Sequence, residues 1–109
     1  MLKRGQIVIL DLKGLNGVHI QKGKRPYVVV QNNTGNVFSP TIIVCPLTTK
    51  TKSTQPTHYT FTRRNGKVNT VLCEQIQTVG KSEVLERLEI LDDATMSEIS
   101  KCLYASIGR

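Results

Sequence analysis

The sequence has little aromatic surface and few cysteines. Its 109 residues include no Trp, two Phe and three Tyr, which leaves few side chains on which flat ligands can stack. The three cysteines, Cys45, Cys73 and Cys102, are widely spaced and form no Cys-x-x-Cys pair, which argues against a zinc site. All three lie among apolar neighbours, so we expect buried, reduced thiols.

Long hydrophobic runs are also missing. The longest apolar stretches, residues 27–30 and 42–47, are far too short to cross a bilayer, and no apolar region of signal-peptide length precedes Asp11. We therefore expect a cytoplasmic protein without a membrane span. A chain of this length has room for one core, so residues 1–109 are interpreted as a single domain.

Several catalytic motifs are absent as well. The chain has no glycine-rich phosphate loop, no His-Glu-x-x-His, no pair of acids at metal-ligand spacing and no nucleophile elbow. If this is an enzyme, we expect it to work without a metal or a cofactor.

What the chain does have is an uneven charge. Residues 1–70 carry 11 Lys or Arg and one Asp, a net +10, whereas residues 71–109 carry four Lys or Arg and seven acids, a net −3. A basic region of this kind points to a polyanionic partner. A basic face kept for solubility is the alternative.

The apolar pattern predicts short strands followed by one helix. Asn65-Gly66 is typical of a hairpin turn, residues 32–36 are dense in turn formers, and Pro46 suggests an edge strand or a bulge. Five strands are expected before any helix, with a further one after them, at residues 6–12, 27–31, 41–47, 57–62, 67–73 and 85–91.

The final helix has clear signals at both ends. Asp92 can cap its start, Gly108 can end it, and helical spacing relates the apolar residues Met96, Ile99, Leu103 and Ile107. Strands closed by one terminal helix predict a mainly β protein, as a small barrel or a strongly curled sheet. The helix is expected to cover the open end of the barrel, and part of its stripe could be shared with a second copy.

Polar residues that could do chemistry are few: Arg25, Thr48-Thr49, His19, His58 and Glu74-Gln75. Each one also fits an ordinary surface or turn position. A basic, cofactor-free site suits RNA transesterification, because RNA carries its own nucleophile in the 2′-hydroxyl and the protein need only position it and stabilise the phosphorane.

Five motifs in order resemble the MazF/PemK/Kid toxins of bacterial toxin-antitoxin pairs, from about Arg4 to Gly108. They are Arg4-Gly5-Gln6-Ile7, residues 24–32 around Arg25-Pro26, Ser39-Pro40-Thr41 with the apolar run after it, Pro46-Leu47-Thr48-Thr49, and Glu74-Gln75-Ile76. The resemblance implies an SH3-like small β-barrel (MazF/PemK/CcdB-like), a homodimer, sequence-specific cleavage of single-stranded RNA, and inhibition by a cognate antitoxin.

The same resemblance implies that Arg25 and Thr48 are the catalytic pair. Arg25 can hold a phosphate oxygen through its fork of donors, and the Thr48 hydroxyl can donate to another oxygen. Attack by the 2′-hydroxyl would leave 2′,3′-cyclic phosphate and 5′-hydroxyl ends. A guanidinium is a poor general base, so the proton acceptor stays open, with Glu74 and His58 as candidates.

With so few aromatic residues, recognition is expected to depend on hydrogen bonds to the edges of splayed bases. Gln77 departs from the resemblance, since the family often has a basic residue there. The expected RNA contacts are His19, Gln21, Asn32, Asn33, Lys50, Lys52, Glu74 and Gln75.

Two other functions fit parts of the pattern. Gyrase-poison toxins share this barrel but have no need of the Arg25 and Thr48 pair. A non-catalytic SH3-like module that binds RNA or protein would need the basic face alone.

Overall fold

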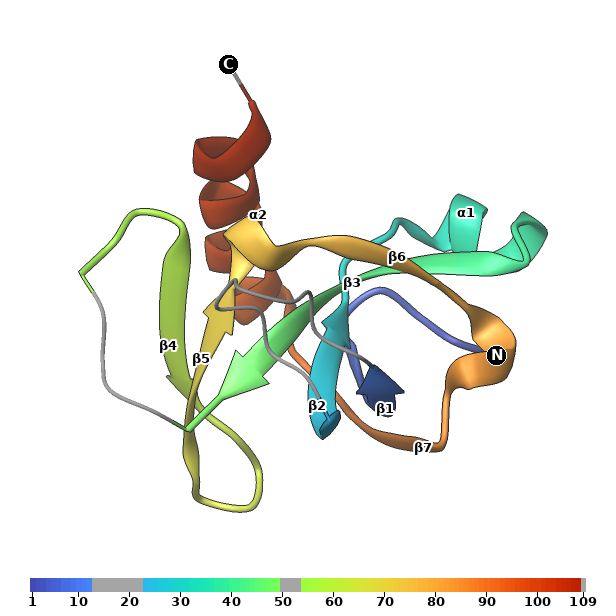
Figure 1. Ribbon diagram of the computed structural model, residues 1–109. Helices are drawn as coiled ribbons and strands as arrows, with labels where there is room; N and C mark the ends of the chain where they lie inside the picture. Colours follow the sequence, from blue (N-terminus) through green and yellow to red (C-terminus); the bar gives the residue numbers. More distant parts are fainter. Residues whose placement is uncertain (13–22, 50–53, 109) are drawn as a thin grey trace.

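The chain forms one antiparallel sheet with a helix packed against it (Figure 1). The structure is a computed structural model that describes residues 1–12, 23–49 and 54–108. Within these ranges there are seven strands, two α-helices and two single 3-10 turns. They are β1 (Gln6–Leu12), β2 (Gly23–Val29), α1 (Asn33–Phe38), β3 (Thr41–Thr48), β4 (His58–Thr62), β5 (Val68–Leu72), η1 (Cys73–Gln75), β6 (Gln77–Gly80), η2 (Lys81–Glu83), β7 (Glu86–Ile90) and α2 (Asp93–Ile107).

Strand β3 is the centre of the sheet. The strand order is β4-β5-β3-β2-β1-β7, and β6 pairs with the first half of β3. On one edge β3 pairs with β2, and on the other it pairs first with β6 and then, at Leu47 and Thr48, with β5. β3 therefore pairs with two different strands along the same edge, and the sheet curls where β6 and β5 separate.

Pro46 was expected to mark an edge strand or a bulge, and the prediction of an edge strand is wrong. Pro46 lies opposite Tyr27 inside a strand that is paired on both sides. On the second edge, however, the β6 ladder ends at Val44 and the β5 ladder begins at Leu47. Pro46 lies in the gap between these two ladders. Because proline has no N–H to donate, it fits a position in a central strand where no ladder hydrogen bond is required.

Apolar residues on alternate faces of the strands build two cores. Ile7 and Val28 belong to the core beneath α2, together with Met96 and Ile99 of that helix. Their neighbours Val8 and Val29 belong to the core on the opposite face. Because both faces of the central strands are buried, these strands have nearly continuous apolar runs rather than a strict alternation.

The three cysteines lie in or beside the core under α2. Cys45, Cys73 and Cys102 are all buried and reduced, as predicted. A hydrogen bond with Cys45, together with burial, raises the pKa of the Cys73 thiol. Thiols of this kind are unreactive packing groups.

The asparagine-rich segment after β2 forms a short helix, α1, and not the predicted turn. The expectation that five strands precede any helix is therefore wrong. Asn32 caps α1 by accepting a hydrogen bond from the Gly35 N–H at 2.9 Å. Asn36 is buried and donates to the Gln31 carbonyl at 3.0 Å. Residues that favour turns also favour helix caps, so composition alone did not separate the two.

The predicted ends of α2 are confirmed. Asp92 accepts from the Thr95 N–H at 2.8 Å, and the Gly108 N–H donates to the Tyr104 carbonyl at 2.7 Å. Met96 and Ile99 are buried, whereas Ile107 is 67% exposed. The apolar stripe thus covers the sheet with its first turns and leaves its last turn in solvent. No helix in the described part of the chain is long and apolar enough to cross a membrane.

Candidate active site

Arg25 and Thr48 line one pocket of about 250 Å³. The pocket lies where β2 begins and β3 ends, and the turn between β4 and β5 forms another side of it. Its lining residues are Ile9, Arg25, Pro26, Leu47, Thr48, Thr49, Arg63, Asn65, Lys67 and Asn69.

The strand register explains why Arg25 and Thr48 meet. Antiparallel pairing sets Tyr27 opposite Pro46. Extended by two residues, the same register brings Arg25 alongside Thr48. On the other edge of β3, Thr48 lies opposite Thr70, and the Thr48 side chain is buried. Two strands thus hold residues 23 positions apart in sequence at the same end of the sheet.

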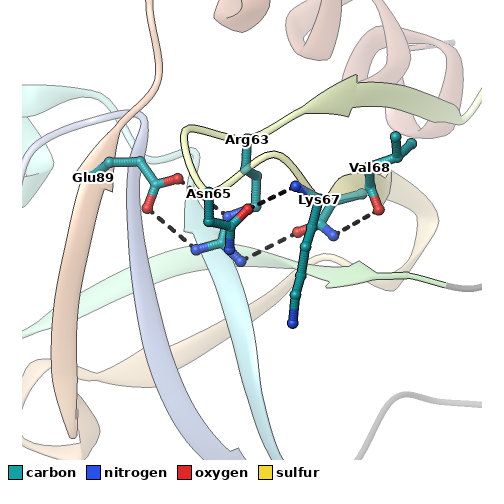
Figure 2. Close-up of polar contacts among 6 residues, drawn as sticks. Arg63, Asn65, Lys67, Val68 and Glu89 are labelled. Carbon is teal, nitrogen blue, oxygen red and sulfur yellow. Dashed lines mark hydrogen bonds and ion pairs between the residues drawn. The ribbon is translucent and has the colours of Figure 1, made fainter.

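The β4–β5 turn carries a partly buried ion pair, shown in Figure 2. Arg63 donates to both carboxylate oxygens of Glu89 on β7, from Nε and from a terminal nitrogen, each at 3.2 Å. The other terminal nitrogen lies 3.3 Å from the Asn69 side-chain oxygen. Only about a tenth of each side chain of the pair is exposed, at 10% for Arg63 and 11% for Glu89. The pair is therefore desolvated and geometrically fixed.

The electrostatics of the pocket favour an anion. Arg25, Arg63 and Lys67 all line it, and the described lining includes no Asp or Glu. The negative charge of Glu89, which is not in the described pocket lining, compensates the positive charge of Arg63. The hydrogen bond from Arg63 holds the pKa of Glu89 below its usual range, against the opposing effect of burial. Arg25 and Lys67 add positive charge to the pocket lining, which favours an anionic ligand.

The two candidate proton acceptors, His58 and Glu74, lie elsewhere. His58 Nε2 is 2.9 Å from the Glu74 carboxylate, and neither residue is in the described lining of the pocket. His58 pairs with Leu72 at the end of the β4–β5 ladder opposite the turn. Burial alone would raise the pKa of Glu74. Hydrogen bonds from His58, the backbone and Thr57 together lower it by more than burial raises it, so the net shift of the pKa is downward. Glu74 is thus a hydrogen-bond partner of His58.

Of the expected RNA contacts, the four within the described residues, Asn32, Asn33, Glu74 and Gln75, are not in the described lining of this pocket. Asn32 caps α1, and the Asn33 side-chain oxygen accepts from the Arg4 N–H at 2.8 Å. Gln75 is half-buried in η1, and Gln77 pairs with Val44 in β6. Four of the predicted contacts, His19, Gln21, Lys50 and Lys52, lie outside the described residues.

Four residues of the pocket lining were not predicted from the sequence, namely Arg63, Asn65, Lys67 and Asn69. The Asn65-Gly66 turn was predicted, and the basic residues beside it were a usable signal. Gly66 has the positive φ, +83°, that such a turn requires. Nothing in the sequence indicated that this turn lies over the ends of β2 and β3.

Chemically, the pocket is suited to a phosphate group. An arginine and a threonine hydroxyl on adjacent strands can donate to different oxygens of one phosphorus centre. In the described part of the chain, no three His, Cys, Asp or Glu residues come together as a metal site would require. The arrangement supplies positioned donors and positive charge, which is what stabilisation of a phosphorane needs.

Comparison with known proteins agrees with this geometry. A family model described as PemK-like, MazF-like toxin of type II toxin-antitoxin system matches residues 3–107. A mycobacterial endoribonuclease, solved in complex with its cognate antitoxin, is 28% identical, with 99% of this chain and 96% of that chain covered and a TM-score of 0.81. Another structure of a mycobacterial endoribonuclease is also 28% identical, with 98% of this chain and 91% of that chain covered and a TM-score of 0.80.

The fold itself is shared more widely. A crystal structure of MazF from Deinococcus radiodurans is 24% identical, covers 99% of this chain and 97% of that chain, and gives a TM-score of 0.82. The predicted fold class, a mainly β SH3-like small barrel with a C-terminal helix, is confirmed.

Proposed function

Because the chain belongs to the PemK-like, MazF-like toxins of type II toxin-antitoxin systems, we propose that it is an endoribonuclease that cuts single-stranded RNA at a short sequence. The similar mycobacterial endoribonucleases support this assignment. The observation that carries it is the pocket in which Arg25 and Thr48 lie together with other basic residues.

We propose that Arg25 and Thr48 act on the phosphate that is cleaved. The 2′-hydroxyl of the preceding ribose gives up its proton as its oxygen bonds to phosphorus, the bond from phosphorus to the 5′-oxygen breaks, and the leaving 5′-oxygen takes up a proton, so that no net proton is consumed. The guanidinium of Arg25 compensates the charge that builds up on the phosphorane, while the Thr48 hydroxyl donates to a second oxygen. The products carry a 2′,3′-cyclic phosphate and a 5′-hydroxyl.

The proposed partners are a second copy of the chain and an acidic antitoxin. One of the similar endoribonucleases was solved with its cognate antitoxin, and an antitoxin of this chain would meet the strongly basic half of the sequence. A homodimer is proposed from the resemblance, and the exposed last turn of α2, with Tyr104 and Ile107, is available apolar surface.

Cleavage should proceed at the same rate with and without excess EDTA, since the reaction as proposed uses protein donors and the nucleophile of the RNA. The measurement is the digestion of a long RNA followed on a gel, with the 5′ ends mapped to give the recognition sequence. Loss of activity in EDTA with recovery on Mg²⁺ would contradict the mechanism. No cleavage by a folded chain would contradict the function itself and favour a binding module or a gyrase poison.

An acidic antitoxin segment should exclude RNA from the basic pocket. Opposite charge speeds the encounter and makes it sensitive to salt, so the association rate should fall steeply as ionic strength rises. Stopped-flow binding of the antitoxin peptide at several salt concentrations measures this, with a charge-neutralised peptide as the control. A ternary complex in which peptide and RNA occupy the same pocket would refute the prediction.

A further inference from the structure

We propose that four pocket-lining residues of the β4–β5 turn and the start of β5, Arg63, Asn65, Lys67 and Asn69, form a second substrate-binding wall, in which Lys67 binds an RNA phosphate next to the one that is cleaved. These four residues are called the hairpin wall below. This inference rests on the proposed function, because it assigns residues to the same RNA site.

The hairpin wall is anchored across the open seam of the sheet. The strand order places β4 and β7 at opposite ends of the sheet, without a ladder between them in the described structure. Arg63, just after β4, forms its bidentate ion pair with Glu89 on β7. Figure 2 shows this pair reaching from the turn to Glu89 on β7. The ion pair thus joins the two edge strands where backbone bonds do not.

Arg63 is a positioning residue rather than a ligand of the RNA. Its Nε and one terminal nitrogen are used by Glu89, and the other terminal nitrogen faces Asn69. Asn69 is itself buried and donates to the Val68 carbonyl at 2.9 Å. Breaking this arrangement would leave a partly buried charge without its partner, which is unfavourable.

The turn is also held by hydrogen bonds within it. The Lys67 N–H donates to the Asn65 side-chain oxygen, and the Arg63 N–H donates to the Lys67 carbonyl, both at 2.9 Å. A further bond runs from the Gly66 N–H to the Arg63 carbonyl, also at 2.9 Å. The base of the Lys67 side chain is therefore fixed in space, although its end is not.

Lys67 has the properties of a phosphate ligand. It is exposed, it lines the pocket, and its ammonium has no hydrogen bond to any of the residues that the structure describes. In Figure 2 its side chain extends away from the Arg63–Glu89 pair. A lysine is a compact point charge on a flexible stem, which suits the capture of a phosphate whose geometry varies.

Position within the pocket indicates which phosphate Lys67 binds. Arg25 comes from β2, whereas Lys67 comes from the turn that forms another wall. A single strand of RNA that presents its scissile phosphate to Arg25 and Thr48 continues on both sides of that phosphate. On this proposal the neighbouring phosphate lies at the wall that carries Lys67, where it contributes to affinity rather than to the chemical step.

The test compares Lys67→Ala with Arg64→Ala. Arg64 is the matched control, because it is exposed in the same turn, carries the same charge and does not belong to the described pocket lining. A single-stranded RNA with one 2′-deoxy nucleotide at the cleavage position serves as the probe for fluorescence anisotropy. Single-turnover cleavage of the all-ribose RNA at saturating enzyme gives the chemical step.

Lys67→Ala should weaken RNA binding more than Arg64→Ala and leave the rate at saturation unchanged. Its plot of log K against log salt should be shallower by about 0.7, the value for one phosphate contact on a single strand. Equal affinities and equal salt slopes for the two variants would overturn the assignment. A lower saturated rate with unchanged affinity would also overturn it, because Lys67 would then act in the chemical step.

A double-mutant cycle tests the positioning role of the ion pair. Glu89→Gln should weaken RNA binding in the wild-type background and have little further effect in Lys67→Ala, because its effect passes through Lys67. A merely structural role would lower affinity equally in both backgrounds, which would overturn the positioning role. Thermal unfolding of each variant sets the temperature at which all are folded.

Different experimental results would overturn this inference and the proposed function. A wild-type chain that cuts RNA, with Lys67→Ala indistinguishable from Arg64→Ala, overturns the hairpin wall alone. A folded wild-type chain that neither cuts nor binds RNA overturns both.

Discussion

Arg25→Ala should lower the cleavage rate by ~100 to 1000-fold, the usual effect of removing one preorganised transition-state donor. Arg25 lines the pocket beside Thr48, and its strand neighbours fix its position: Leu10 on β1 lies opposite it in the β1–β2 ladder, and Pro26 follows it in the chain. Single-turnover kinetics at saturating enzyme measures the effect directly. RNA affinity should fall much less than the rate.

Two further variants identify what Arg25 contributes. Arg25→Lys keeps the charge but loses the fork of donors, so it should recover only part of the rate. Thr48→Val keeps the shape of a buried side chain and removes its hydroxyl, so it should slow the same step. Arg64→Ala removes an exposed positive charge outside the described lining of the pocket and should cut RNA normally. Near-normal cutting by Arg25→Ala would remove Arg25 from the site.

A substrate with a single 2′-deoxy nucleotide immediately 5′ of the scissile phosphate should not be cut at that bond. It lacks the attacking hydroxyl but keeps its phosphates and base edges, so it should still bind and act as a competitive inhibitor. Analysis of the fragment ends by mass spectrometry gives the second readout. Normal products should have a 2′,3′-cyclic phosphate and a 5′-hydroxyl, because no water enters the first step.

The matched control is an RNA with the 2′-deoxy nucleotide two positions away, which should be cut at the normal bond. Cleavage of the modified RNA at the same bond, or products with 5′-phosphates, would mean that water is the nucleophile. The roles proposed for Arg25 and Thr48 would then have to be revised. This experiment is independent of any mutation, so a folding defect cannot imitate its result.

Local signals predicted much of the fold. The alternation in residues 6–12 corresponds to β1, the Asn65-Gly66 pair to the β4–β5 turn, and the caps of α2 were placed at Asp92 and Gly108. Predictions failed where a residue type serves two local structures. The asparagines after β2 cap a helix rather than form a turn, and Pro46 lies in the middle of the sheet.

The proposed site divides in the same way. Arg25 and Thr48 were identified from motifs, and the register of β2 with β3 accounts for their proximity. His58 and Glu74 were considered as proton acceptors because of their chemistry, yet the structure pairs them with each other outside the described lining of the pocket. Side-chain type indicates what a residue can do, and its neighbours decide whether it can do it there.

The sequence by itself determined the family, the mainly β fold with its terminal helix, and the basic first part of the chain, since these depend on motif order, local periodicity and charge. Only the tertiary structure decided that Arg63, Asn65, Lys67 and Asn69 line the same pocket as Arg25 and Thr48. The Arg63–Glu89 pair, between residues 26 positions apart, joins the two edge strands of the sheet. Contacts of this kind arise from the way the sheet curls, which is a property of all its strands together and has no local signal in any one of them.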